Sequence, residues 1–157
     1  MGSLWGADNR GKVNQRRAGF LETVAGRSGA PASEYSIAVR ASVEAGGGAM
    51  AALMASHPDL DAVFFSNDAL MIGAMFECQR RGLRVPADIA LIGFGDLDLT
   101  ACSVPTLSTI RPPRAEIGSA VADHLLRRFS HPDVGEETPD LGFELIARES
   151  TEVVPQN

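Results

Sequence analysis

The sequence predicts an α/β fold in which a parallel β-sheet is flanked by helices. From the first third of the chain onward, strand-like segments alternate with helix-like segments, which is the pattern of a parallel sheet covered by helices. Three of the strand-like segments are continuously apolar, as expected of strands buried on both faces. The length of 157 residues and the apolar share of 45% fit one packed domain of ordinary size.

Five segments are predicted as strands because they are short, apolar and bounded by turn-forming residues. They are 35–39 (YSIAV), 62–66 (AVFFS), 89–94 (IALIGF), 107–111 (LSTIR) and 143–148 (FELIAR). The first residues, GSLWGAD, resemble the end of a strand and its following loop, but no hairpin or helix precedes them to supply a partner. We therefore expect the chain to lack an upstream half of its fold.

The spacing of apolar residues predicts a first helix over 12–25 and a second over 44–56, which Pro58 ends. Three consecutive glycines, residues 46–48, lie near the start of the second helix. Each glycine costs a helix about 1 kcal/mol relative to alanine. Either this helix begins later, or its backbone approaches another segment closely.

A third helix is predicted to begin after Asp68, a suitable N-cap residue. Its apolar residues surround almost the whole circumference, so we expect the excess apolar face to meet another surface. A fourth helix is predicted over 114–129, followed by a polar loop over 130–140. Its apolar side chains are expected to point inward; they are Ile117, Ala120, Val121, Leu125 and Phe129.

Composition excludes several classes of protein. The net charge of −6 disfavours DNA binding by this segment, because DNA-binding domains carry a basic face. Cys78 and Cys102 lack CxxC spacing and are predicted to be small buried hydrophobes. His57, His124 and His131 lack metal-ligand spacing. No apolar run approaches the roughly twenty residues of a membrane span, and no export signal is present, so a cytoplasmic location is expected.

No enzyme motif is complete in this sequence. The residues GFGD at 93–96 follow a predicted strand, as a dinucleotide-binding loop does, but Asp98 replaces the third glycine of GxGxxG. The motifs GxxxxGK[ST], GxSxG and HExxH are absent. We therefore expect neither an enzyme nor a cofactor, a nicotinamide-dependent enzyme included.

Polar side chains follow two predicted strands at their carboxyl ends, where open α/β sheets place their ligand crevice. Asn67 follows the strand over 62–66, and Asp96 follows the strand over 89–94. Both side chains suit hydroxyl groups, because Asn donates and accepts hydrogen bonds and ionised Asp accepts them. Turn and cap roles are the alternative for both residues.

One basic cluster, formed by Arg10, Lys12, Arg16 and Arg17, lies on and just before the first predicted helix. Such a charge run usually forms a solvated face. Alternatively, Arg10 and Arg16 reach the same side when the loop folds back. Their guanidinium groups would then bind a carboxylate or phosphate bidentately.

Four segments, in this order and spacing, resemble the effector-binding core of bacterial LacI/GalR-type transcriptional repressors. They are DNRGKVNQRRAGF, LDAVFFSNDALMIGAM, RRGLRVPADIALIGFGD and VPTLSTIRPPRAEIG. The resemblance implies two α/β lobes like those of periplasmic sugar-binding proteins, a ligand cleft between them and a helix-turn-helix headpiece in front. It also implies that residues 1–157 form mainly the second lobe, as a truncated sensor domain without the headpiece.

Carried onto this sequence, the resemblance implies that Arg16, Asn67 and, as in some members, Arg10 contact a small-molecule effector. Where the family often has two acidic or amide residues after a glycine and an aromatic, this chain has Gly95 and Asp96. The missing carboxylate at Gly95 leaves the basic cluster uncompensated, which favours an acidic ligand. The GFGD variant also resembles the gluconate-repressor branch, so the expected effector is a sugar acid such as gluconate.

The resemblance further implies a homodimer formed through the third helix and residues 99–104. The candidate contacts are Met71, Met75, Leu99 and Cys102, with ordinary core packing as an equally open alternative. Two-fold pairing would align two headpieces on paired DNA half-sites, so DNA is an expected partner only through the headpiece. The alternative function is a sugar solute-binding protein of a transport system.

Overall fold

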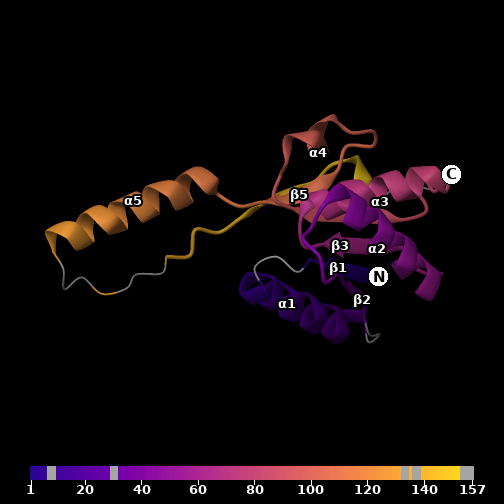
Figure 1. Ribbon diagram of the computed structural model, residues 1–157, viewed down its shortest axis with the longest axis horizontal. Coiled ribbons are helices and arrows are strands. Elements are labelled where there is room, and N and C mark those ends of the chain that lie inside the picture. The colour runs from indigo at the N-terminus through magenta and orange to yellow at the C-terminus, as the bar shows by residue number, and fades with distance from the viewer. Residues whose placement is uncertain (7–9, 29–31, 132–134, 136–138, 153–157) are drawn as a thin grey trace.

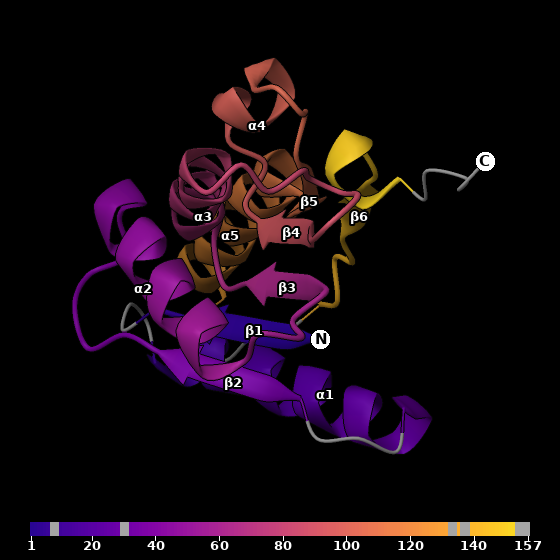
Figure 2. The same ribbon diagram turned by 90° about the vertical axis from the view of Figure 1, so that its right-hand side faces the viewer.

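The computed structural model shows a six-stranded sheet with helices on both faces (Figure 1; Figure 2). The structure describes residues 1–6, 10–28, 32–131, 135 and 139–152. In chain order the elements are β1 (Gly2–Trp5), α1 (Arg10–Ser28), β2 (Ser33–Ser36), α2 (Val43–Ser56), β3 (Ala62–Phe65), α3 (Asp68–Arg80), β4 (Ala90–Phe94), α4 (Asp98–Cys102), β5 (Ser108–Arg111), α5 (Arg114–Ser130), β6 (Glu144–Ile146) and the 3₁₀ helix η1 (Glu149–Thr151). The predicted α/β class with a parallel sheet is confirmed.

The strand order is β2-β1-β3-β4-β5-β6, and every pairing is parallel except that of β5 with β6. The connection from β1 leads outward to β2, whereas the following connections run in the opposite direction through β3, β4 and β5. The carboxyl ends of β1 and β3 therefore form the point where the strand order reverses, which is where such sheets open a ligand crevice.

Three predictions about the strands differ from the structure. The segment expected to lack a partner is β1, a buried strand that pairs with β2 and with β3, both of which follow it in sequence. A strand in a parallel sheet needs no preceding hairpin, because its neighbours arrive through helical crossovers. The last predicted strand, β6, is antiparallel to β5, and β2 covers 33–36 rather than 35–39.

The helices α2 and α3 cover one face of the sheet and pack unusually closely against each other. A Cβ atom on Gly46 would lie 2.2 Å from the backbone oxygen of Leu70, and one on Gly73 would lie 1.9 Å from that of Val43. Of the glycines at the start of α2, Gly46 is therefore explained by the close approach of the α3 backbone. The helix itself begins at Val43, earlier than predicted.

An aromatic cluster fills the other face, beneath α1. Phe20 from α1 stacks on Phe64 with ring centroids 5.5 Å apart, and Trp5 meets both rings edge-on. Because strand side chains alternate between faces, Phe64 points to α1 while Val63 and Phe65 join the core with α2 and α3. The sheet is therefore packed on both faces around β1 and β3, and this packing holds their carboxyl ends in place.

The apolar excess of α3 is used within the fold. Asn67, not Asp68, is the N-cap, and Asp68 is the first helical residue. Met71 and Met75 are buried in the core at 0% and 2% exposure, so they are not available to a second copy and their prediction as dimer contacts was wrong. The additional apolar face of α3 packs against α2 at their close crossing. Phe76 is the large apolar side chain of α3 that remains exposed.

The amphipathic helix predicted over 114–129 exists as α5, but its apolar face is not directed inward. Figure 1 shows α5 projecting away from the sheet, because β5 leads the chain out and β6 brings it back. None of its residues is buried. Its large apolar side chains are exposed; they are Ile117, Val121, Leu125, Leu126 and Phe129.

The two cysteines differ in environment. Cys78 is buried in the core, as predicted, and burial raises the pKa of its thiol to about 11. Cys102 ends the short helix α4 and is exposed, so its predicted burial was wrong. In the described part of the chain no group of His, Cys, Asp and Glu side chains is arranged to hold a metal ion, and no helix is long and apolar enough to cross a membrane.

Candidate functional site

The candidate site lies at the carboxyl edge of the sheet, at the ends of the neighbouring strands β1 and β3. The connections that follow these two strands lead in opposite directions across the sheet. Ser66, the residue after β3, connects the elements there. Its hydroxyl accepts a hydrogen bond from the Gly6 backbone N–H (2.9 Å), and its carbonyl accepts one from Nη2 of Arg16 (3.2 Å). The predicted site residue Asn67 follows immediately. Ser66 therefore brings α1, β1 and the start of α3 to one point.

Arg16 is a cation with no anionic partner among the residues that the structure describes. Its guanidinium lies over the Phe94 ring, 4.0 Å from the centroid, and its Nε atom is buried without a hydrogen-bond partner. None of the ion pairs within the described residues includes Arg16. Burial lowers the pKa of Arg16 from its ordinary value, because the charged form loses solvent and gains no carboxylate in return.

Asn67 caps α3 through its side-chain oxygen, which accepts a hydrogen bond from the Leu70 backbone N–H at 3.1 Å. The capping role left open by the sequence is thus confirmed. Because the cap uses the oxygen, the amide nitrogen of Asn67 is the part of this side chain that can donate to a ligand. The cap also fixes the side chain next to the Ser66 carbonyl that Arg16 contacts.

The GFGD segment (93–96) ends in a turn after β4 that has unusual backbone angles. Gly95 has a φ of +131° and Asp96 a φ of +52°, both in the region that favours glycine. Gly93 leaves room for a buried carboxylate, since a Cβ there would lie 2.2 Å from Oδ1 of Asp68. The absence of an acidic side chain at Gly95 therefore has a backbone reason in addition to its effect on charge.

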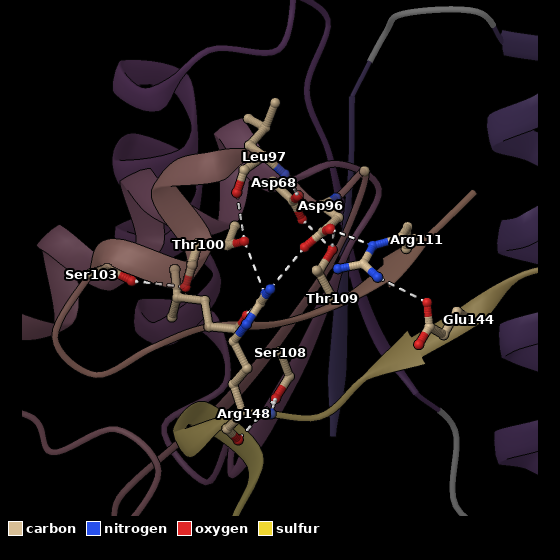
Figure 3. A network of polar contacts seen from close by, with 12 residues as sticks. Asp68, Asp96, Leu97, Thr100, Ser103, Ser108, Thr109, Arg111, Glu144 and Arg148 are labelled. Carbon is tan, nitrogen blue, oxygen red and sulfur yellow. Dashed lines mark hydrogen bonds and ion pairs between the residues drawn. The ribbon is translucent and has the colours of Figure 1, made fainter. Parts of the chain in front are cut away.

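Asp96 is held by two arginines (Figure 3). Its Oδ1 accepts from Nη2 of Arg148 at 2.9 Å, and its Oδ2 accepts from Nε of Arg111 at 2.6 Å. Desolvation acts to raise the pKa of Asp96, but the hydrogen bonds and charges of Arg111 and Arg148 outweigh it and hold the pKa below its ordinary value. Arg111 also pairs with Glu144 across β5 and β6, at 2.9 Å.

A second carboxylate, Asp68, lies buried behind this turn. It accepts hydrogen bonds from the Thr109 hydroxyl (2.7 Å) and the Leu97 backbone N–H (2.9 Å). Burial raises the pKa of Asp68, and these two hydrogen bonds oppose the rise only in part. Sequence reasoning missed the roles of Asp68, Thr109 and Arg148, because no motif or periodicity connects positions so distant in the chain.

The structure places three of the four predicted site residues at one edge of the sheet. Arg16 and Asn67 are joined through Ser66, and Arg16 reaches the β4 end through Phe94, two residues before Asp96. Arg10 is the first residue of α1, and its side chain lies outside the described residues. A hollow of about 690 Å³ opens beside the loop after β2; its lining comprises Val39, Arg40, Ala41, Ser42, Glu44 and Ala45.

Arg114 adds a further cation near the turn. Its Nη2 donates to the Gly95 carbonyl oxygen, and none of the ion pairs within the described residues includes Arg114. Arg16 and Arg114 thus contact consecutive residues, Phe94 and Gly95, while Asp96 is balanced by its own arginines. The arrangement suits a ligand that carries negative charge and hydroxyl groups.

Residues 4–151 match the family described as periplasmic binding protein-like domain. The chain is 49% identical over 110 residues to the HTH-type transcriptional regulator GntR of Pseudomonas aeruginosa, a match that covers 70% of this chain and 32% of that protein. The chain therefore spans about a third of the length of this curated relative. The relative is a transcriptional regulator by name, which does not favour the transport alternative.

Solved structures agree with this assignment. The transcription regulator GntR from Chromobacterium violaceum superposes with a TM-score of 0.88 at 32% identity, covering 96% of this chain and 55% of that one. A LacI family regulator from Enterococcus faecium with bound ribose superposes with a TM-score of 0.80 at 25% identity, covering 95% and 55%. The chain therefore belongs to the periplasmic binding protein-like domain family, in the form found in LacI-type transcription regulators.

Proposed function

We propose that this chain is the effector-sensing part of a LacI-type transcriptional regulator and that its effector is a sugar acid such as gluconate. The observation that carries the proposal is the partly buried guanidinium of Arg16, which has no carboxylate partner among the described residues. A buried charge without a counter-ion is costly, so an anionic ligand would stabilise it.

The charges around Arg16 support an acid over a neutral sugar. The position after Phe94 is Gly95, which carries no carboxylate, and the nearby Asp96 is already paired with Arg111 and Arg148. Arg16 would bind the acid group, and the amide nitrogen of Asn67 would donate to a hydroxyl oxygen. Arg10, at the start of the same helix as Arg16, is proposed as a further ligand contact.

A sugar-type ligand is also supported by the Enterococcus relative, whose structure contains ribose. Solved relatives are longer than this chain, which covers 55% of each of the two described above. We propose that in complete regulators the additional residues supply a facing lobe and a DNA-binding headpiece. The exposed apolar face of α5 would pack against that lobe, DNA would bind through the headpiece alone, and the protein would act in the cytoplasm.

Effector control would follow from preferential binding to one arrangement of the two lobes. A ligand that binds both arrangements equally shifts neither, so contacts from both walls of the cleft are needed. The residues described here form one wall. We therefore expect weak effector binding by this chain alone and tighter binding once the facing lobe is supplied.

The test is calorimetry on a chimera in which residues 1–152 of this chain replace the matching part of the complete Pseudomonas regulator. Gluconate, phosphorylated gluconate and neutral hexoses are titrated in turn, with the 157-residue chain as the comparison. We expect gluconate or its phosphorylated form to bind more tightly than any neutral hexose, because only the acids neutralise Arg16. Tighter binding of a neutral hexose would contradict the proposal.

We also propose that two copies pair through the surface around α4. With Met71 and Met75 in the core, the remaining predicted contacts are Leu99, at 48% exposure, and Cys102. Light scattering should therefore give a dimer mass, and Ellman's reagent should react with Cys102 more slowly at high protein concentration than at low. Cys78, buried with a pKa of about 11, is the internal control and should stay unreactive at both. A monomer mass with a constant Cys102 rate would refute pairing.

A further inference from the structure

Arg148, between β6 and η1, connects several segments of the fold around the GFGD turn. Its side chain is 15% exposed and donates to Asp96 on the turn, to the Thr100 hydroxyl in α4 (3.0 Å) and to the Leu107 carbonyl before β5 (2.8 Å). Figure 3 shows the Arg148 guanidinium between Asp96 and Thr100. An arginine with this many directed hydrogen bonds is held in one geometry.

The turn that Arg148 holds does not adopt its shape from local preferences alone. Asp96 is a non-glycine residue with a positive φ, a conformation that costs free energy and persists only where surrounding contacts impose it. Its backbone N–H donates to the Thr109 hydroxyl at 3.3 Å, and the next N–H, of Leu97, donates to Asp68. The Asp96 carboxylate completes these restraints by its pairs with Arg148 and Arg111.

The restrained turn is connected directly to the proposed ligand contact. Phe94 is the last residue of β4 and immediately precedes the turn, and its ring supports the Arg16 guanidinium at 4.0 Å. The Gly95 backbone N–H donates to the Ile110 carbonyl at 2.8 Å, so the turn is joined to the end of β5. A change in the turn would therefore shift the ring on which Arg16 rests.

We propose that Arg148 is a positioning residue for the effector site: through Asp96 it fixes the turn after β4 and thereby the Phe94 ring beneath Arg16. In this role Asp96 acts on the effector indirectly, through its hydrogen bonds with Arg111 and Arg148. The expected effect of Arg148 on effector binding rests on the proposed function. Its expected effect on the turn and on the contact between Arg16 and Phe94 does not.

The structural readout uses the 157-residue chain and the substitution Arg148→Met, which keeps the apolar stem and removes the donors. Amide hydrogen exchange at Gly95 and Leu97 should accelerate relative to the core strands, and the nuclear Overhauser contacts between Arg16 and the Phe94 ring should weaken. Arg84→Met is the matched control, because Arg84 forms an exposed pair with Asp88 at 2.6 Å. Unchanged exchange and contacts in Arg148→Met would overturn the inference.

The ligand readout uses gluconate calorimetry on the chimera described above. Arg148→Met should weaken binding roughly tenfold. This is the size expected for the loss of charge-assisted hydrogen bonds that hold the turn and do not contact the effector themselves. Arg148→Lys should restore part of the affinity, and Arg148→Met should have little further effect when Asp96→Asn is already present. A purely structural role would instead lower the denaturation midpoint without this dependence on Asp96.

The outcomes separate the two proposals. If the unsubstituted chimera does not bind gluconate, the proposed effector is wrong, and the exchange and Overhauser measurements still decide whether Arg148 positions Phe94 and Arg16. If the chimera binds gluconate and Arg148→Met binds it equally well in a folded protein, the positioning role is refuted and the proposed function stands. An equal loss of affinity in Arg84→Met would also refute a specific role for Arg148.

Discussion

Replacing Gly73 with alanine is expected to lower the free energy of unfolding of this chain strongly. The new Cβ would lie 1.9 Å from the Val43 backbone oxygen and 2.8 Å from the Gly47 backbone nitrogen. Neither atom belongs to a flexible side chain, so the α2–α3 crossing itself would have to open. Overpacking typically costs about 1–3 kcal/mol and occasionally more, a large part of the roughly 5–15 kcal/mol that stabilises a typical domain. Gly46→Ala should behave alike, because its Cβ would lie 2.2 Å from the Leu70 backbone oxygen.

Gly48 provides the matched control within the same run of glycines. A Cβ there meets no atom within 4 Å, and the residue lies inside α2. Gly48→Ala should therefore stabilise the protein by about 1 kcal/mol, the difference in helix propensity. Denaturation in urea, followed by far-ultraviolet circular dichroism, gives the free energy of unfolding for each variant. A Gly73→Ala protein as stable as the parent would mean that the helices cross at a greater distance.

The second large effect is expected at Arg16. In the chimera, Arg16→Met should weaken gluconate binding by about 2–5 kcal/mol, the cost of truncating one partner of a buried charge pair. Each 1.4 kcal/mol corresponds to about a factor of ten in the dissociation constant. Binding of neutral sugars, measured by the same calorimetry, should weaken less, because they present no charge to the guanidinium. The selectivity for the acid is therefore the quantity that should collapse.

Arg17→Met is the control for this substitution. Arg17 is the neighbouring arginine on α1, but it is exposed and forms a bidentate pair with Glu34, with Nε to Oε2 at 2.7 Å and Nη2 to Oε1 at 2.5 Å. Removing an exposed pair costs little, so gluconate affinity should stay close to that of the parent. Equal losses in the two variants would show that α1 affects binding only through its general charge.

Local sequence information was sufficient for most elements of this fold. Helices α1, α2 and α5 and the strands β3, β4 and β5 were predicted close to their observed bounds, and α3 was predicted from its start, because apolar periodicity reports which face of a segment is buried. The short elements α4 and η1 were missed, since a single turn has no periodicity to detect. The strand β1 was misjudged because its partners β2 and β3 follow it in sequence.

The residues of the candidate site likewise include some that the sequence predicted and some that it missed. Asn67 and Asp96 were identified as residues following strands, and the basic cluster contained Arg16, because position after a strand and the density of charge are local properties. From the same local patterns we predicted Met71 and Met75 on a dimer surface and the apolar face of α5 directed inward. Both errors concern the surface against which an apolar side chain packs. The exposed apolar face of α5 shows that an amphipathic pattern does not identify the surface that will cover it.

By itself the sequence determined the α/β class, most of the elements, the acidic net charge and the candidate residues at the strand ends. Only the tertiary structure decided that Arg16 rests on Phe94, that Asp96 is held by Arg148 from 52 positions away, and that two glycines set the distance between α2 and α3. The physical reason is that periodicity and propensity act between near neighbours in the chain. Ion pairing, desolvation and close packing depend on distances in space, which only the folded chain defines.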